Sequence, residues 1–152
     1  MLERKIDKII LHCSDSDIPQ HDDIKIIDIW HKSKGWNSVG YHYFIKYIGD
    51  LQIGRPLSQI GAHCYGENAT SIGICLSGKK QFSDAQFDTL YKLCKNLMDV
   101  FNLKMDDIYG HNEFNEIKTC PNFNVKNFRI CLNLNLIPKR VDMISEKDLS
   151  LS

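Results

Sequence analysis

The feature that most constrains this chain is one continuous apolar stripe within residues 83–101. Ser83 and Gln86 stand at the spacing of a capping box, which predicts that a helix begins here. Apolar residues then recur every three or four positions, as on one helix face: Phe87, Leu90, Tyr91, Cys94, Leu97, Met98 and Phe101. Such a helix must bury its stripe against another layer of structure, so the rest of the chain has to supply that layer.

Short apolar runs elsewhere in the chain are the natural partners for this helix. Residues 6–12, 71–77 and 107–110 are predicted as strands, and residues 40–54, which contain a Gly-Asp turn, as a hairpin. The run at 71–77 alternates large and small residues, so the large ones share one strand face and Gly73 leaves room on the other. The chain therefore supplies a sheet for the helix to cover.

Two further helices and the order of the elements complete the fold prediction. Helices are expected at about 22–34 and 125–134, where apolar residues again recur at helical spacing. Helices interleaved with strands indicate an α/β (mixed α+β) fold, a single domain with a central mixed β-sheet flanked by helices. We expect the domain to span residues 1–137 and the charged stretch 138–152 to be a loosely ordered tail.

Composition removes several classes of function. The 19 basic residues balance the 19 acidic ones, so nothing in the overall charge favours nucleic acid or an anionic membrane as partner. No apolar run approaches the ~20 residues of a membrane span, and the first residues lack the apolar segment of a signal peptide. We expect a monomer, made in the cytoplasm without a signal peptide, that does not insert into membranes and keeps its cysteines mostly reduced.

Three residues suggest a metal site. His12 ends the first predicted strand, His111 follows the strand at 107–110, and Cys120 comes nine residues later. Two imidazoles and one thiolate leave the fourth position of tetrahedral zinc free for water, as in catalytic zinc sites. Spacing alone does not establish the site, because this combination of residues is not a distinctive pattern.

Lys118 belongs to the same segment as Cys120. Pro121 favours an extended conformation at Cys120, and in an extended segment residues two apart point the same way. An ammonium group near a metal would stabilise the oxyanion of a tetrahedral intermediate. The alternative is that Lys118 is an ordinary solvated surface lysine.

Eight segments together resemble one known enzyme family. They occur in order over most of the chain, at residues 9–14, 30–36, 39–45, 54–56, 61–63, 71–76, 110–114 and 118–123. In combination they look like the zinc-dependent N-acetylmuramoyl-L-alanine amidases of the type 2 family, which includes phage amidase lysozymes and peptidoglycan recognition proteins. The resemblance implies a mixed sheet with helices packed on it and a groove with zinc at its floor.

The resemblance also assigns roles to single residues. It implies that His12, His111 and Cys120 bind zinc, that Tyr41 is the catalytic tyrosine and that Lys118 stabilises the oxyanion.

Two more histidines stay ambiguous at this point. His42 either contacts substrate or is a structural neighbour of Tyr41, and His63 either contacts substrate at the groove rim or closes a loop.

The function implied is peptidoglycan hydrolysis by a zinc-activated water, at the amide between N-acetylmuramic acid and the L-alanine of the stem peptide. Polymeric wall or a soluble muropeptide would be the substrate, with action on the wall after release, as for a phage endolysin, or recycling in the cytosol. One alternative is a non-catalytic peptidoglycan-binding or sensing module of the same fold. Another is a hydrolase with Cys13, Cys64 or Cys120 as nucleophile, which would need no metal.

Overall fold

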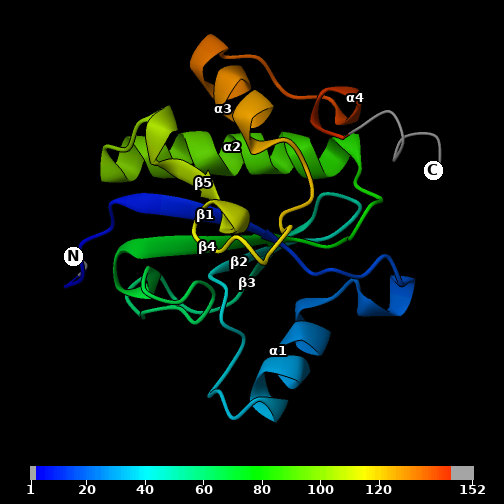
Figure 1. The fold of residues 1–152 in the computed structure, drawn as a ribbon, viewed down its shortest axis with the longest axis vertical. Helices are drawn as coiled ribbons and strands as arrows, with labels where there is room; N and C mark the ends of the chain where they lie inside the picture. Colours follow the sequence, from blue (N-terminus) through cyan, green and yellow to red (C-terminus); the bar gives the residue numbers. More distant parts are fainter. Residues whose placement is uncertain (1–2, 145–152) are drawn as a thin grey trace.

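The structure, a computed structural model that describes residues 3–144, is a five-stranded mixed sheet between helical layers (Figure 1). The strands and α-helices follow one another as β1 (Lys8–Cys13), α1 (Ile24–Ser33), β2 (Tyr43–Ile45), β3 (Leu51–Ile53), β4 (Ser71–Leu76), α2 (Asp84–Phe101), β5 (Ile108–Gly110), α3 (Val125–Leu134) and α4 (Arg140–Met143). Short 3₁₀ turns lie at Pro19–His21, Asn68–Thr70, Met105–Asp107 and His111–Glu113. The predicted fold class is confirmed.

The strand order places two carboxyl-terminal strand ends side by side. The order across the sheet is β3-β2-β4-β1-β5, with β2, β4, β1 and β5 parallel and only β3 antiparallel, as the return strand of the hairpin. Leu11 of β1 is in register with Ile74 of β4 and with Gly110 of β5. The residues that follow Leu11 and Gly110 therefore meet at one edge of the sheet.

The two faces of the sheet bury different elements. Alternate residues of β1 and β4, among them Leu11 and Ile74, pack under the apolar stripe of α2, which begins with the predicted capping box. The opposite face carries Phe44 and Cys75, which pack with Ile27 of α1. Figure 1 shows α2 and α3 on one side of the sheet and α1 on the other. No helix within residues 3–144 is both long and apolar enough to cross a membrane.

The end of the described chain differs from the loosely ordered tail that the sequence suggested. Residues 138–144 include α4, and Met143 and Ile144 are buried in the main core. The Asn124 amide donates a hydrogen bond of 2.7 Å to the Met143 carbonyl, which ties α4 to the start of α3. Because charged residues surround these two apolar residues in the sequence, composition alone suggested a tail. Residues 145–152 lie outside the described part of the chain.

Candidate metal centre and active-site pocket

The parallel register brings His12, His111 and Cys120 together. His12 is the penultimate residue of β1, and His111 follows β5 directly in the neighbouring position of the sheet. Cys120 arrives on the following loop, where its Sγ accepts a hydrogen bond of 2.8 Å from the Cys13 amide. Metal-ligating atoms of the three predicted residues all lie within 4.8 Å of one another.

The chemistry of these three groups fits zinc. Hydrogen bonds from Cys13, His111 and His12 lower the pKa of the Cys120 thiol well below its usual value, which favours the thiolate. Burial lowers the pKa of His12, which is 1% exposed, so its imidazole stays neutral and keeps a lone pair. One thiolate and two neutral imidazoles are donors that zinc prefers, and three protein ligands are typical of a catalytic site.

Two of the three residues, His111 and Cys120, line a pocket of about 1000 Å³, which Tyr41 and Lys118 also line, while His12 is buried beside it. The ring centroids of Tyr41 and His12 are 5.0 Å apart. Burial raises the pKa of Tyr41 well above its usual value, so its hydroxyl stays protonated. Tyr43, by contrast, lies in β2 and packs against the main core. Tyr41 precedes this strand, so the two tyrosines have different surroundings although they are only two residues apart.

The segment that carries Lys118 is not the extended strand that the sequence suggested. The Lys118 amide bonds to the Asn115 carbonyl at 3.0 Å, and the Asn122 amide to the Thr119 carbonyl at 3.1 Å, so the chain turns twice. The Cys120–Pro121 peptide bond is cis. Lys118 and Cys120 nevertheless line the same pocket, with Lys118 exposed to solvent at its wall.

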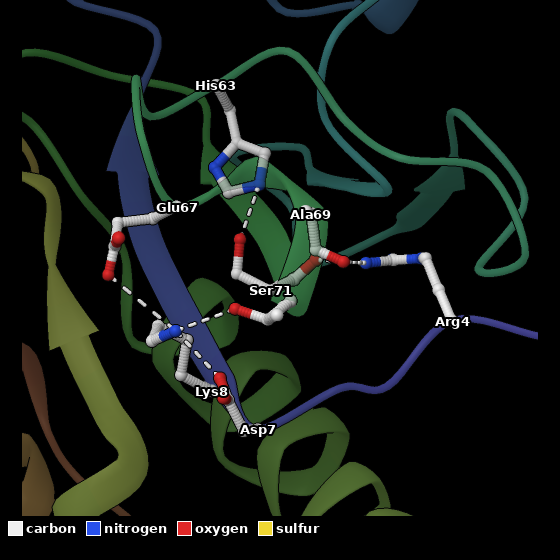
Figure 2. A network of polar contacts seen from close by, with 8 residues as sticks. Arg4, Asp7, Lys8, His63, Glu67, Ala69 and Ser71 are labelled. Carbon is white, nitrogen blue, oxygen red and sulfur yellow. Dashed lines mark hydrogen bonds and ion pairs between the residues drawn. The ribbon is translucent and has the colours of Figure 1, made fainter.

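His63 lies at the pocket but is largely enclosed. It lines the pocket and is 8% exposed. Its Nδ1 is 2.8 Å from Nε2 of His12, and its Nε2 is 3.2 Å from the Ser71 hydroxyl, a contact drawn in Figure 2. Burial holds the pKa of His63 well below its usual value, so the ring is neutral.

His42 is fully buried and does not line the pocket. Its Nδ1 accepts a hydrogen bond of 3.1 Å from the Gly73 amide, so the proton of the neutral ring is on Nε2, which donates to the Gln59 carbonyl at 2.8 Å. Burial lowers the pKa of His42 to about 4. This arrangement favours the structural alternative for His42 over a substrate contact.

Several pocket residues were not singled out from the sequence. His31 and Trp36, near the end of α1, both line the pocket, and so do Tyr65 and Ile117, whose side chains are strongly exposed. His31 accepts a hydrogen bond of 2.7 Å from the Gly40 amide, which links α1 to the segment before Tyr41. Periodicity gave no signal for the other three, because Trp36 lies beyond the end of α1 and both Tyr65 and Ile117 lie in loops.

The cysteines do not offer an activated nucleophile apart from the candidate metal ligand. Cys13 is 4% exposed, and its Sγ is 3.3 Å from that of Cys120; the hydrogen bond to Cys120 and burial raise the pKa of its thiol. Burial also raises the pKa of Cys64. A nucleophilic cysteine needs the opposite, a thiolate at neutral pH in an accessible position.

Comparison with known proteins gives a consistent result. The family model described as N-acetylmuramoyl-L-alanine amidase matches residues 2–123. The endolysin of Escherichia phage T7 is 34% identical over 128 residues, which cover 79% of this chain and 83% of that protein. Among solved structures, the N-acetylmuramoyl-L-alanine amidase LysCS from Clostridium intestinale URNW aligns with a TM-score of 0.75 and 28% identity, covering 88% of this chain and 86% of that one. Drosophila PGRP-LB shares the fold, with a TM-score of 0.68 and 21% identity over 93% of this chain and 88% of that one.

Proposed function

This chain belongs to the N-acetylmuramoyl-L-alanine amidase family, and from that premise we propose that His12, His111 and Cys120 hold a catalytic zinc ion beside Tyr41 and Lys118. The enzyme is a peptidoglycan amidase, which hydrolyses the amide between N-acetylmuramic acid and the L-alanine of the stem peptide. The observation that carries the proposal is the convergence of these five residues from distant parts of the chain. One open pocket is lined by His111, Cys120, Tyr41 and Lys118, and His12 is buried beside it, with its ring against those of His111 and Tyr41.

Each residue of the site has a distinct task. Zinc in this set would supply Lewis-acid chemistry, polarising the scissile carbonyl and increasing the acidity of water. The Tyr41 hydroxyl stays protonated and would orient the attacking water or assist proton transfer. The Lys118 ammonium lines the same pocket and would stabilise the oxyanion that forms on the carbonyl oxygen.

We extend the proposal to the substrate and the place of action. The pocket is open and large enough for a muramyl peptide, and the first relatives compared are phage endolysins. The proposed substrate is therefore polymeric wall, reached after release from the cell that makes the enzyme, with the enzyme acting as a monomer. We propose that His63 forms part of the pocket wall. His42 would have a structural role behind it, because it accepts a hydrogen bond from the Gly73 amide.

Metal removal tests the mechanism. Purified protein should bind about one equivalent of zinc, a chelator should abolish hydrolysis, and added zinc should restore it. Cys120→Ser should lose zinc and activity, because a hydroxyl is a poor substitute for a thiolate, whereas Cys131→Ser, on α3, should keep both. Full turnover by metal-free protein would overturn the zinc mechanism.

Product analysis tests the bond that is cut. Digestion of purified peptidoglycan should release new α-amino groups on L-alanine without new reducing sugar ends. New amino ends on a later stem residue would indicate an endopeptidase instead, and new reducing ends a glycosidase, which would require a pair of carboxylates beside the sugar bond.

A further inference from the structure

His63 stands between the proposed zinc ligand His12 and the hydroxyl of Ser71. One ring nitrogen contacts His12 at 2.8 Å and the other contacts Ser71 at 3.2 Å. Figure 2 shows His63 above Ser71, at the start of the central strand β4. Both polar atoms of the ring are therefore engaged within the protein, which leaves neither free for a substrate.

The fold provides a slot for this ring. A Cβ atom built on Gly73 would lie 2.6 Å from Cγ of His63, and one on Gly61 would lie 2.7 Å from its Cδ2, closer than real Cβ atoms approach. Two small residues of β4, Ser71 and Gly73, thus face the imidazole, while its large residues pack in the core under α2. The absence of side chains at both glycines leaves the space that the ring occupies.

The loop that carries His63 is also fixed. The Asn68 side-chain oxygen accepts hydrogen bonds of 2.9 Å from both the His63 and the Cys64 amides. Lys8 of β1 bonds to the Thr70 hydroxyl at 2.8 Å. It also pairs with Glu67 at 3.6 Å, as seen in Figure 2. Ring and loop are therefore held independently of any ligand in the pocket.

The direction of the hydrogen bonds follows from the role of His12. Because Nε2 of His12 faces His63, its Nδ1 is the nitrogen that remains for a metal, and a neutral imidazole that binds metal through Nδ1 carries its proton on Nε2. His12 then donates to Nδ1 of His63. The proton of His63 must in turn be on Nε2, from which it is donated to the Ser71 hydroxyl.

We propose that His63 is a positioning residue for the metal: it fixes the tautomer and the ring orientation of His12, and Ser71 fixes the tautomer of His63. This inference rests on the proposed function, since it takes His12 as a zinc ligand. A partner that accepts the second N–H of a ligating histidine makes it a better ligand, and loss of such a partner typically costs about 10–100-fold in metal affinity.

Zinc affinity, measured by competition with a chromophoric chelator, tests the proposal without reference to catalysis. His63→Ala should weaken zinc binding about 10–100-fold. His63→Asn should bind within a few-fold of wild type, because the amide oxygen can stand where Nδ1 stood and accept from His12. His21→Ala is the matched control: it removes a histidine that bonds to Ser16 outside the pocket, and zinc affinity should not change.

The outcomes separate this inference from the proposed function. If wild-type protein binds no zinc, the proposed metal site fails. If wild type binds zinc and His63→Ala binds it equally well, or if His63→Asn is as weak as His63→Ala, the positioning role is refuted. Thermal unfolding of the zinc-free variants shows whether the substitution also alters folding.

A second measurement needs no substitution. Long-range proton–nitrogen correlation spectra of the zinc-loaded wild type report which ring nitrogen of each histidine carries the proton. Both His12 and His63 should be protonated on Nε2. A proton on Nδ1 of His63 would reverse the direction of the hydrogen bond and overturn the proposal.

Discussion

Tyr41 and Lys118 occupy opposite environments within one pocket. The Tyr41 ring packs beside that of His12 and its hydroxyl is shielded from solvent, whereas the Lys118 side chain is exposed to solvent. A buried neutral donor keeps its orientation through the reaction, while an exposed cation is free to follow the charge that develops on the substrate. The two side chains should therefore respond differently to substitution.

Lys118→Ala should lower kcat by about 10²–10³ and leave KM nearly unchanged, because a group that stabilises only the oxyanion does not act in the ground state. Steady-state kinetics on a soluble muropeptide would separate the two constants. Lys126→Ala, an exposed lysine of α3 away from the pocket, is the matched control. Near-normal kcat in Lys118→Ala would show that Lys118 is an ordinary surface lysine without a role in catalysis.

Tyr41→Phe should lower kcat by about 10²–10⁴, the range for loss of a proton-transfer group, while wall binding in a sedimentation assay persists. Tyr43→Phe removes a hydroxyl from the neighbouring core residue and should keep full activity. The reverse result, with Tyr43→Phe inactive, would exchange the roles of the two tyrosines.

At the scale of elements, local pattern predicted most of the fold. The capping box at Ser83, the stripe of α2 and the large-small alternation of β4 depend on neighbours in the sequence, so periodicity reveals them. The contact of His63 with His12 spans 51 positions, and the burial of Met143 depends on α3; neither leaves a local pattern. The proposed zinc-binding role of His12, His111 and Cys120 came from the family resemblance, because the spacing of these residues is not distinctive.

The cap of α2 gives a stability prediction. The Ser83 hydroxyl accepts from the Gln86 amide at 3.1 Å, and the Gln86 side chain bonds back to the Ser83 amide at 3.0 Å. Ser83→Ala should reduce the free energy of unfolding by about 1 kcal/mol, measured by urea denaturation, and Ser83→Thr by less. Activity of the folded protein should not change, since α2 lies across the sheet from the pocket. A stability loss below a few tenths of a kcal/mol would contradict the cap.

At the scale of the whole molecule, the sheet separates the larger apolar core on one face from the candidate active-site residues on the other. The face under α2 carries the larger apolar core, and the opposite face carries His12, Gly73 and the buried histidines. Neutral buried imidazoles make this second face sensitive to acid, because each must remain unprotonated for its hydrogen bonds to persist.

His42 makes that sensitivity measurable. Its pKa in the folded protein is about 4, below the ordinary value of 6.5, so the unfolded chain binds the proton first as pH falls. The stability contribution is complete above pH 6.5 and is lost progressively towards pH 4, at up to about 1.4 kcal/mol per pH unit.

His42→Asn retains an acceptor for the Gly73 amide but does not titrate, so it should flatten this dependence. Urea unfolding of zinc-free protein at pH 7.5, 6 and 5 would compare the two slopes; equal slopes would exclude His42 as the source.

Gly73 links the sequence requirements of two positions that no local pattern connects, namely 63 and 73. An imidazole at position 63 and any side chain at position 73 compete for the same volume, so the two positions form one steric unit. In a library randomised at both, functional clones should retain glycine at 73 whenever they retain histidine at 63. They should accept alanine or serine at 73 only when a smaller residue that can still accept from His12, such as asparagine, replaces the histidine. Positions 63 and 73 should thus covary. If a relative has a different pair of residues here, introducing one of its two residues alone should inactivate the enzyme, whereas introducing both should preserve activity.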